Sequence, residues 1–385
     1  MQKIELDYEP LIVKNGIKCE MSDSQLAFLC GMLKHKKPKK IVEVGVAHGG
    51  TTCVIIQSLK MLGHSVEFHS IDITEECYGE KSKKTGYAVD MTFDTMPNNI
   101  SHKWHLGKIL PQVLDSIGKD IDIIILDTTH SLPGEMLDFL AAFPYLSQNA
   151  VVILHDIILN QEVANHEFSF ATRMVYDVVV AEKIIADGID IDKKLPNIGA
   201  FMVNNDTEKY IEKCFSSLAV TWTYDLSNEI LEQYMKVYSK FYDNELIDLF
   251  KRVVSLNRDR MKREKDSIQE IKNFNKYVDH DYKLVLLGGG DFAERISHYL
   301  KMIGRKVDAY VISDNASLKE CRIEDNIYHF SDLPFSQSEC NLVIAMSEDK
   351  HEEVLQYLKY NKFHKIYPSK DDNYSNFINY LDKFN

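Results

Sequence analysis

Short apolar runs rich in β-branched residues alternate with longer amphipathic segments between residues 40 and 225. Runs of the first kind are typical of buried strands, and the longer segments, with apolar residues three and four apart, are typical of helices. This alternation predicts an α/β fold with a mostly parallel, seven-stranded sheet covered by helices on both faces. The predicted strands are residues 40–45, 66–72, 103–106, 121–127, 150–156, 199–204 and 220–225.

A helix is predicted immediately before the first of these strands. Ser22 is followed three residues later by Gln25, which is the capping-box pattern of a helix start. The strands and this helix together define a first α/β domain over residues 1–226. Because ligands of such sheets bind at the carboxyl ends of the strands, we expect the site there.

The pattern changes over residues 227–278, where apolar residues recur at helical spacing and a strongly charged stretch, NRDRMKREKDSIQEIK, follows. A charged stretch of this kind is typical of a solvated helix face. We therefore expect a helical connector that bridges two domains or pairs with a second copy of the chain, as in a homo-oligomer. The aromatic residues of this segment are predicted to form a packed helix face; they are Tyr234, Tyr238, Phe241 and Tyr242.

A second and shorter strand–helix alternation occupies residues 279–385, a length within the usual range for one domain. Gly288, Gly290 and Ala293 match the pattern G-x-G-x-x-A between a predicted strand and a predicted helix, and Asp314 ends the next strand. Turns of this type hold nucleotides, but they also serve helix packing alone. We expect a small Rossmann-like α/β domain.

Composition narrows the class of protein. The chain has 385 residues, enough for two domains, and its net charge of −13 argues against sequence-independent nucleic-acid binding. Its seven cysteines form no C-x-x-C pair, which favours reduced thiols in a cytoplasmic protein. The start of the chain has no leader-like pattern, and no apolar run reaches transmembrane length, so no membrane partner is expected.

A glycine turn follows the first predicted strand in IVEVGVAHGG, residues 41–50. Its glycines at 45, 49 and 50 do not have the G-x-G-x-x-G spacing of dinucleotide sites. Glu43 beside the turn would repel a diphosphate but attract a cationic amino acid group. Asp72, at the end of the second strand, can accept hydrogen bonds from both hydroxyls of a ribose. These residues favour S-adenosylmethionine over a dinucleotide.

Four successive motifs carry a resemblance to a known family. VEVGVAHGGTT, SIDI, IIILDTTHS and VVILHDI resemble, in their order and spacing, the motifs of class I S-adenosylmethionine-dependent methyltransferases. The subgroup most similar is that of the macrocin O-methyltransferase and cephalosporin hydroxylase-like enzymes, which act on sugars and small molecules. The resemblance covers about residues 20–225. The second domain resembles small Rossmann-like modules of bacterial surface-sugar enzymes.

This resemblance implies roles for individual residues. The methionine part of the cofactor would lie against the glycine turn, the ribose at Asp72 and the adenine near Gly107, with Asp127 also at the cofactor. In two places the sequence departs from the family pattern, since Lys108 and Thr129 stand where acidic residues are common. The turn residues implied to contact the cofactor are Glu43, Gly45, Ala47, Gly49, Gly50 and Thr51.

The catalytic chemistry is expected at the ends of the strands that precede Asp127 and Asp156. A hydroxyl acceptor needs a general base or a divalent cation to attack a methyl group at neutral pH. Asp127, His155 and Asp156 are the candidate ligands of Mg²⁺ or another divalent cation. His130 is the candidate general base, on the expectation of an ordinary imidazole pKa of about 6.5. Asp138 is expected to be only a helix-capping or surface residue.

Together these features predict an S-adenosylmethionine-dependent O-methyltransferase. The predicted acceptor is a hydroxyl of a sugar or nucleotide-linked sugar, as in capsule or other surface polysaccharide biosynthesis. Two alternatives remain open: a noncatalytic nucleotide-binding scaffold, and an NAD-dependent oxidoreductase that uses the C-terminal domain. The absence of a G-x-S-x-G motif argues against a hydrolase.

Overall fold

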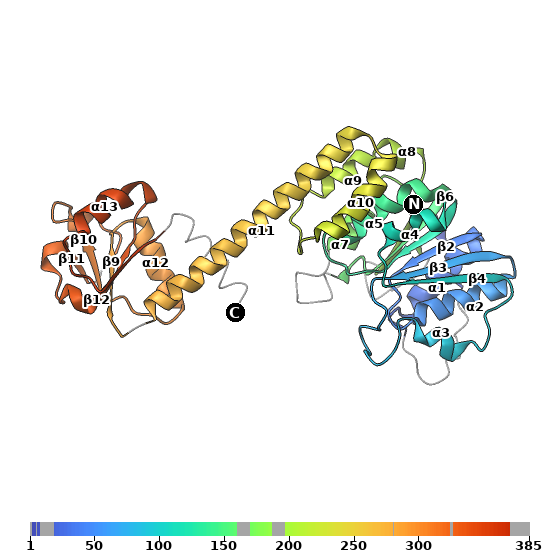
Figure 1. The fold of residues 1–385 in the computed structure, drawn as a ribbon, viewed down its shortest axis with the longest axis horizontal. Helices are drawn as coiled ribbons and strands as arrows, with labels where there is room; N and C mark the ends of the chain where they lie inside the picture. Colours follow the sequence, from blue (N-terminus) through green and yellow to red (C-terminus); the bar gives the residue numbers. More distant parts are fainter. Residues whose placement is uncertain are drawn as a thin grey trace. The chain divides into compact units, whose positions relative to one another are not determined.

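The chain folds into two compact units, Met1–Arg258 and Asp259–Asn385 (Figure 1). The computed structural model describes residues 2–4, 6–7, 19–159, 170–186, 197–279, 281–323 and 326–369. Within these residues, no helix has the length and apolar character needed to cross a membrane. Each unit is built around its own sheet, which confirms the predicted fold class.

The first unit contains an eight-stranded sheet in the order β1-β7-β8-β6-β5-β2-β3-β4. Strand β8 runs antiparallel to both of its neighbours, and the other neighbouring pairs are parallel. Chain order reverses between β5 and β2, which makes this the topological switch point of the sheet. The strands are β1 (Gln2–Ile4), β2 (Lys40–Val44), β3 (Val66–Asp72), β4 (Ile100–Leu106), β5 (Ile121–Leu126), β6 (Leu146–His155), β7 (Glu182–Ala186) and β8 (Ile198–Met202).

Six of the seven strands predicted for this unit are present, and the strand predicted at 220–225 is wrong. There, Trp222 is buried, its indole N–H donates to the Leu218 carbonyl and its backbone N–H donates to Asn257. The alternating pattern therefore reflects one aromatic side chain packed among helices. The sequence pattern did not predict β1 and β7, which are three and five residues long.

Helices cover both faces of this sheet (Figure 1). One face packs on α1, α2 and α3, whose apolar side chains join Ile41, Ile123 and Ile153 in one core. The alternate strand residues Val42, Ile124 and Val152 are equally buried and point to the opposite face. Helices α4, α5 and α10 pack on one another there. The helices of this unit are α1 (Asp23–Lys36), α2 (Gly50–Leu62), α3 (Tyr87–Thr92), α4 (Leu110–Ile117), α5 (Gly134–Ala142), α7 (Phe170–Val178), α8 (Asn205–Lys209), α9 (Ile211–Ser217) and α10 (Asn228–Phe241).

The predicted helical connector forms α10 and the 35-residue α11 (Asn244–Val278), which crosses the boundary between the units. The first part of the connector packs on α5, because Tyr238 and Tyr242 donate hydrogen bonds to the carbonyls of Leu137 and Leu140. The prediction of a packed aromatic face is thus confirmed for these two tyrosines. The predicted capping box of α1, formed by Ser22 and Gln25, is also present.

The second unit contains a five-stranded, fully parallel sheet in the order β11-β10-β9-β12-β13. Its strand order also reverses at the first strand, which fits a Rossmann-like arrangement. Asp314 accepts a hydrogen bond from the Ser331 backbone N–H, and Asp291 at the start of α12 pairs with Arg322. The elements are β9 (Lys283–Leu287), α12 (Asp291–Met302), β10 (Ala309–Ile312), β11 (Ile327–His329), β12 (Cys340–Ile344), α13 (His351–Leu358) and β13 (Lys365–Pro368).

The end of β2 depends on a glycine with a left-handed backbone. Gly45 has φ of +93°, and a Cβ atom there would lie 1.7 Å from the Asp127 carbonyl oxygen. Gly63, at the end of α2, also has a positive φ of +72°, but a Cβ there would meet nothing within 4 Å. A comparison of alanine substitutions at these two glycines therefore separates the cost of a left-handed backbone from the cost of steric overlap.

We expect Gly45→Ala to reduce the free energy of unfolding by more than about 3 kcal/mol, because β2 and β5 must separate to admit the methyl group. Gly63→Ala should cost only about 1–2 kcal/mol, the strain of a left-handed residue alone. Urea denaturation of both variants measures the difference. Equal losses would contradict the close packing of the two strand ends.

Candidate active site

A cavity of about 730 Å³ opens at the switch point between β2 and β5. It is lined by residues that follow β2, β3, β4 and β5, and also by residues of α5, α10 and the segment before α10. Its volume is typical of a site for a ligand of cofactor size. The structure thus places the candidate cofactor turn, the acidic residue that ends β3, and Asp127, His130 and Asp156 around one cavity.

The glycine turn forms one wall of this cavity. Gly45, Ala47, Gly50 and Thr51 line it, whereas Gly49 is the N-cap residue of α2, with φ of +89°. Gly107 also has a positive φ but does not line the cavity; its neighbour Lys108 does. The cofactor contacts implied for Gly49 and Gly107 therefore have no direct support from the cavity, and both residues shape the backbone around it.

Glu43 lies beneath the turn and does not line the cavity. Its carboxylate accepts hydrogen bonds from the hydroxyl groups of Thr52, at 2.9 and 3.1 Å, and Ser70, at 2.8 Å. Burial raises the pKa of Glu43 to about 8, although the two hydroxyls partly oppose that rise. The carboxyl group therefore supports the turn from below. With this pKa it is mostly uncharged at neutral pH, so the attraction to a cationic group that the sequence predicts has no support from Glu43.

Asp72 lines the cavity and ties the turn to β3. One oxygen accepts the backbone N–H groups of Val46 and Ala47 at 3.0 and 3.2 Å. The other accepts from the backbone N–H and the hydroxyl of Thr74, both at 2.9 Å. Asp72 thus has a structural role in the free protein, and the ribose contact stays a prediction.

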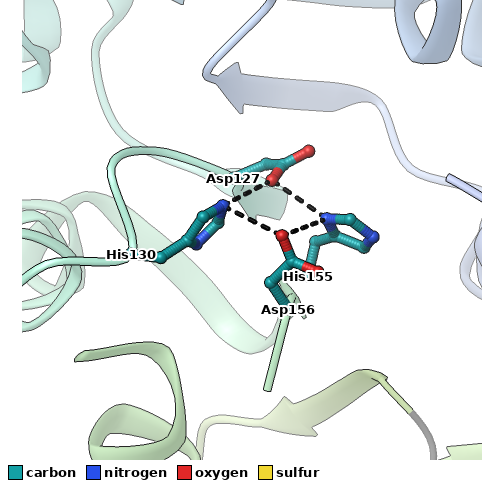
Figure 2. Close-up of side chains that lie close together, drawn as sticks. All are labelled: Asp127, His130, His155 and Asp156. Atoms are coloured by element: carbon teal, nitrogen blue, oxygen red, sulfur yellow. Dashed lines mark hydrogen bonds and ion pairs between the residues drawn. The ribbon is translucent and has the colours of Figure 1, made fainter. Parts of the chain in front are cut away.

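Four side chains from the end of β6 and from the loops after β5 and β6 meet in a cluster that we call the tetrad: Asp127, His130, His155 and Asp156 (Figure 2). The Asp127 carboxylate lies 3.4 Å from His130 Nε2 and 3.1 Å from His155 Nδ1. The Asp156 carboxylate lies 3.2 and 3.5 Å from the same two nitrogens. All four ligand atoms lie within 4.8 Å of one another. The structure therefore brings together every predicted catalytic and metal-binding residue.

The charges of the tetrad are strongly coupled. Burial alone would raise the pKa of Asp127, but the two histidines outweigh it and hold that pKa well below its usual range. Burial likewise opposes the charged form of His130, but Asp127 and Glu135 raise its pKa to about 10. The pKa of His155 is also raised, by Asp127 and Asp156 against burial. The expected ordinary pKa of His130 is therefore wrong: with no cation bound, its ring is protonated at neutral pH.

Glu135 is a functional candidate that the sequence did not reveal. It is fully buried at the start of α5, and its Oε1 accepts hydrogen bonds from the Thr128 hydroxyl at 3.0 Å and the His130 backbone N–H at 2.6 Å. The same oxygen lies 3.4 Å from His130 Nδ1. In the sequence Glu135 reads as an ordinary acidic residue in the first turn of a helix, so no signal pointed to it.

Asp138 is a second correction, because it is neither a capping nor a surface residue. Its side chain is buried in α5, lines the cavity and accepts a hydrogen bond from the Tyr234 hydroxyl at 2.8 Å. Burial raises the pKa of Asp138 to about 7. Tyr224, Leu226 and Ile230 line the same part of the cavity. The segment that leads into the connector and the first helix of the connector thus contribute directly to the site.

Residues 42–157 match a family model described as a methyltransferase domain. This range begins within β2, continues through β6 and includes the whole tetrad. Residues 42–157 therefore form a methyltransferase domain within the first unit. No curated protein sequence is significantly similar to the chain.

Solved structures resemble about half of the chain weakly. A putative O-methyltransferase from Klebsiella pneumoniae is 16% identical with a TM-score of 0.35, and the match covers 48% of this chain and 82% of that one. An O-methyltransferase from Bacillus cereus in complex with S-adenosylhomocysteine is 14% identical with a TM-score of 0.34, covering 48% and 83%. At these values the structures add no argument about substrate or residues.

The buried carboxyl group of Glu43 gives a pH-dependent prediction. Its pKa is about 8 in the folded chain against an ordinary 4.5, so the folded protein holds one more proton than the unfolded chain between these values. Stability from this group is therefore present below about pH 4.5, falls as the pH rises, and is lost above about pH 8. Glu43→Gln cannot ionise and should escape this loss.

We expect the melting temperature of Glu43→Gln, relative to the unsubstituted protein, to rise between pH 5 and pH 9. The exposed Glu232 on α10 provides a matched control, and Glu232→Gln should follow the unsubstituted protein at every pH. Thermal denaturation across this range measures the effect. A difference for Glu43→Gln that does not change with pH would show that the carboxyl group ionises normally.

Proposed function

We propose that the chain is an O-methyltransferase that transfers the methyl group of S-adenosylmethionine to a hydroxyl of a sugar or nucleotide-linked sugar. The observation that carries the proposal is the tetrad at the edge of the cavity in the methyltransferase domain. A neutral hydroxyl needs help to lose its proton, and the tetrad offers both imidazole and carboxylate groups for that purpose. The resemblance of the second unit to modules of surface-sugar enzymes supports the sugar class.

The donor fits the cavity in one direction. Its methionine part would lie against Gly45, Ala47 and Gly50, where the turn leaves the backbone accessible. Its ribose would lie at Asp72, which can exchange part of its present hydrogen bonds for the ribose hydroxyls. This arrangement brings the sulfonium close to the ends of β2 and β5, beside the tetrad.

The tetrad also fits a divalent cation. An ion with bonds of about 2.1 Å to nitrogen and oxygen places neighbouring ligand atoms about 3.0–3.4 Å apart. The four separations between the carboxylates and imidazoles are 3.1–3.5 Å. Two imidazoles beside two carboxylates suit Mn²⁺, Fe²⁺ or Zn²⁺ better than Mg²⁺. When bound, such a cation would supply positive charge that stabilises the alkoxide form of the acceptor.

The transfer itself is a single displacement. The acceptor oxygen forms a bond to the methyl carbon as the carbon–sulfur bond breaks, and the electron pair of that bond stays on sulfur as S-adenosylhomocysteine. Without a cation the acceptor proton can pass to His130 Nε2 only in the small fraction of the protein whose ring is neutral, because the pKa of that ring is about 10. If a cation were held by the tetrad, Nε2 would be one of its ligands and the acceptor proton would leave to water. Glu135 holds the His130 backbone and faces the other ring nitrogen, so it keeps Nε2 directed toward the tetrad.

Transfer to an acceptor is tested by mass spectrometry. The full chain is incubated with S-adenosylmethionine, Mn²⁺ and a panel of nucleotide-linked sugars, free sugars and catechols. We expect a gain of one CH₂ unit in at least one sugar, and His130→Ala should lose that gain while binding S-adenosylhomocysteine with unchanged affinity. Methylation of catechols alone would contradict the sugar class, and tight NAD binding without any response to S-adenosylhomocysteine would favour an oxidoreductase.

Cation binding is tested without reference to activity. Titration of the metal-free protein with Mn²⁺ should show one site, and Asp127→Asn and Asp156→Asn should each weaken it by more than about tenfold. Asp90→Asn, which alters an exposed carboxylate on α3, serves as the control and should bind as the unsubstituted protein does. Equal Mn²⁺ binding by all variants would exclude the tetrad as the cation site.

A further inference from the structure

Two buried acidic side chains of α5 extend the site beyond the tetrad. Glu135 is fully buried, and its carboxylate lies 3.4 Å from His130 Nδ1. Asp138 follows three residues later, so it lies on the same side of the helix, about 4.5 Å further along the axis. Asp138 is 6% exposed and lines the same cavity as three members of the tetrad. The cavity therefore continues from His130 onto a second buried carboxylate.

Neither acid is paired with a lysine or an arginine among the residues that the structure describes. Oε1 of Glu135 receives every contact of that side chain, and its Oε2 is buried with no hydrogen-bond partner in that part of the chain. Asp138 accepts only from the Tyr234 hydroxyl, at 2.8 Å to Oδ1, which leaves its Oδ2 without a donor there. Buried carboxylates are costly unless a cation compensates them, so this part of the site can hold one more positive charge.

Two tyrosines line the cavity around these acids. Tyr234, on α10, holds Asp138 through its hydroxyl. Tyr224 lies on the His130 side, because a Cβ atom on Gly134 would be 3.3 Å from both the Tyr224 hydroxyl and Thr129 Oγ1. Burial, and then the charges of the two acids, raise the pKa of Tyr224, so both tyrosines are neutral. Aromatic rings attract cations, and organic ammonium groups are recognised by such surroundings.

A metal ion suits this place less well than an organic cation. The tetrad is the one group of three or more possible metal ligands among the described residues, and neither Glu135 nor Asp138 belongs to it. The other side chains of this wall include Leu110, Leu226 and Ile230, which are apolar. A metal ion needs several oxygen ligands, whereas apolar walls suit the carbon skeleton of a substrate. The missing positive charge is therefore expected on the substrate.

We propose that Asp138, with Tyr224 and Tyr234 beside it, binds a protonated amine of the methyl acceptor, which is therefore an amino sugar. The inference rests on the proposed function, because it places the reacting hydroxyl of that sugar at the tetrad. An ammonium group has three N–H donors, so it can pair with Oδ2 and still donate elsewhere. A neutral hydroxyl can donate to the same oxygen, but it leaves the buried charge uncompensated.

The spacing along α5 also limits the acceptor. One helical turn separates Asp138 from the acid that faces His130, so the amine and the reacting hydroxyl belong to one sugar ring. Asp138 then acts on the choice of acceptor and does not touch the methyl carbon. It is a specificity-determining residue, and the segment before α10 and α10 itself form part of the acceptor site through Tyr224 and Tyr234.

The first test compares sugars that differ at one carbon. UDP-glucosamine carries a free amine there, UDP-glucose a hydroxyl and UDP-N-acetylglucosamine an uncharged amide; glucosamine and glucose repeat the comparison without the nucleotide. With S-adenosylhomocysteine and Mn²⁺ present at neutral pH, calorimetry on the full chain should show the amine bound about ten- to a hundredfold more tightly than its neutral counterparts. This comparison needs no variant and so does not depend on the folding of one.

Asp138→Asn removes the charge but keeps the size of the side chain and an oxygen that can accept from Tyr234. We expect its preference for the amine to fall to about one, with the affinities for UDP-glucose and S-adenosylhomocysteine little changed. Glu232→Gln, which alters an exposed carboxylate on α10, should keep the full preference. Thermal unfolding of both variants is measured in parallel to show that the fold is retained.

Three results would overturn the inference while S-adenosylhomocysteine still binds: equal or tighter binding of the neutral sugars, no binding of either amino sugar, or an unchanged preference in Asp138→Asn. Fragmentation of the methylated product gives a further check. A CH₂ gain on a sugar oxygen agrees with the inference, whereas a gain on the nitrogen would make the amine the acceptor and would overturn it. If the full chain did not bind S-adenosylhomocysteine, the proposed function itself would fail.

Discussion

The close approach of β2 and β5 is the constraint on which the site depends. Gly45 donates its backbone N–H to Ile71 of β3, and Asp127 donates its own to Val44 of β2, both at 2.9 Å. Three strand ends are thereby fixed within hydrogen-bond distance of one another. No side chain fits between Gly45 and the Asp127 carbonyl, so the cavity wall and the tetrad share one rigid junction. A displacement of either strand would move the cofactor turn and the catalytic candidates together.

Three carboxyl groups of the site have three different kinds of partner; Glu43 and Asp138 are buried and Asp127 is partly buried. Glu43 is paired only with hydroxyl groups, and its pKa rises to about 8. Asp127 is paired with two histidines, and its pKa falls well below its usual range despite burial. Asp138 has one tyrosine partner and a pKa of about 7. Because its partners are cationic, Asp127 keeps its negative charge. Glu43 and Asp138 have only neutral partners, and their pKa values therefore lie close to neutral pH.

The sequence predicted the parts of the fold that follow from local pattern. The strands that end at Val44, Asp72 and Leu126 have clear apolar runs. A glycine turn follows the first strand, Asp72 ends the second and Asp127 follows the third, so the place of the cavity and the members of the tetrad could be predicted. The raised pKa of His130 could not be predicted from the sequence. It depends in part on Glu135, whose carboxylate approaches the ring only once the loop before α5 has folded. The local pattern also predicted a strand at residues 220–225, where the structure has a buried tryptophan, Trp222, and no strand.

The position of the C-terminal boundary of the first unit is a further consequence of tertiary packing. The compact unit extends to Arg258, because Asn257 of α11 accepts from the Trp222 backbone and Arg258 donates to the Leu226 carbonyl. These bonds fix the segment that carries Tyr224 and Leu226, which lines the cavity. A helix that reads in sequence as a connector therefore also holds one wall of the active site. Stability of the first turns of α11 is then a condition for a formed cavity, since loss of those bonds would release the wall without altering any residue of the tetrad.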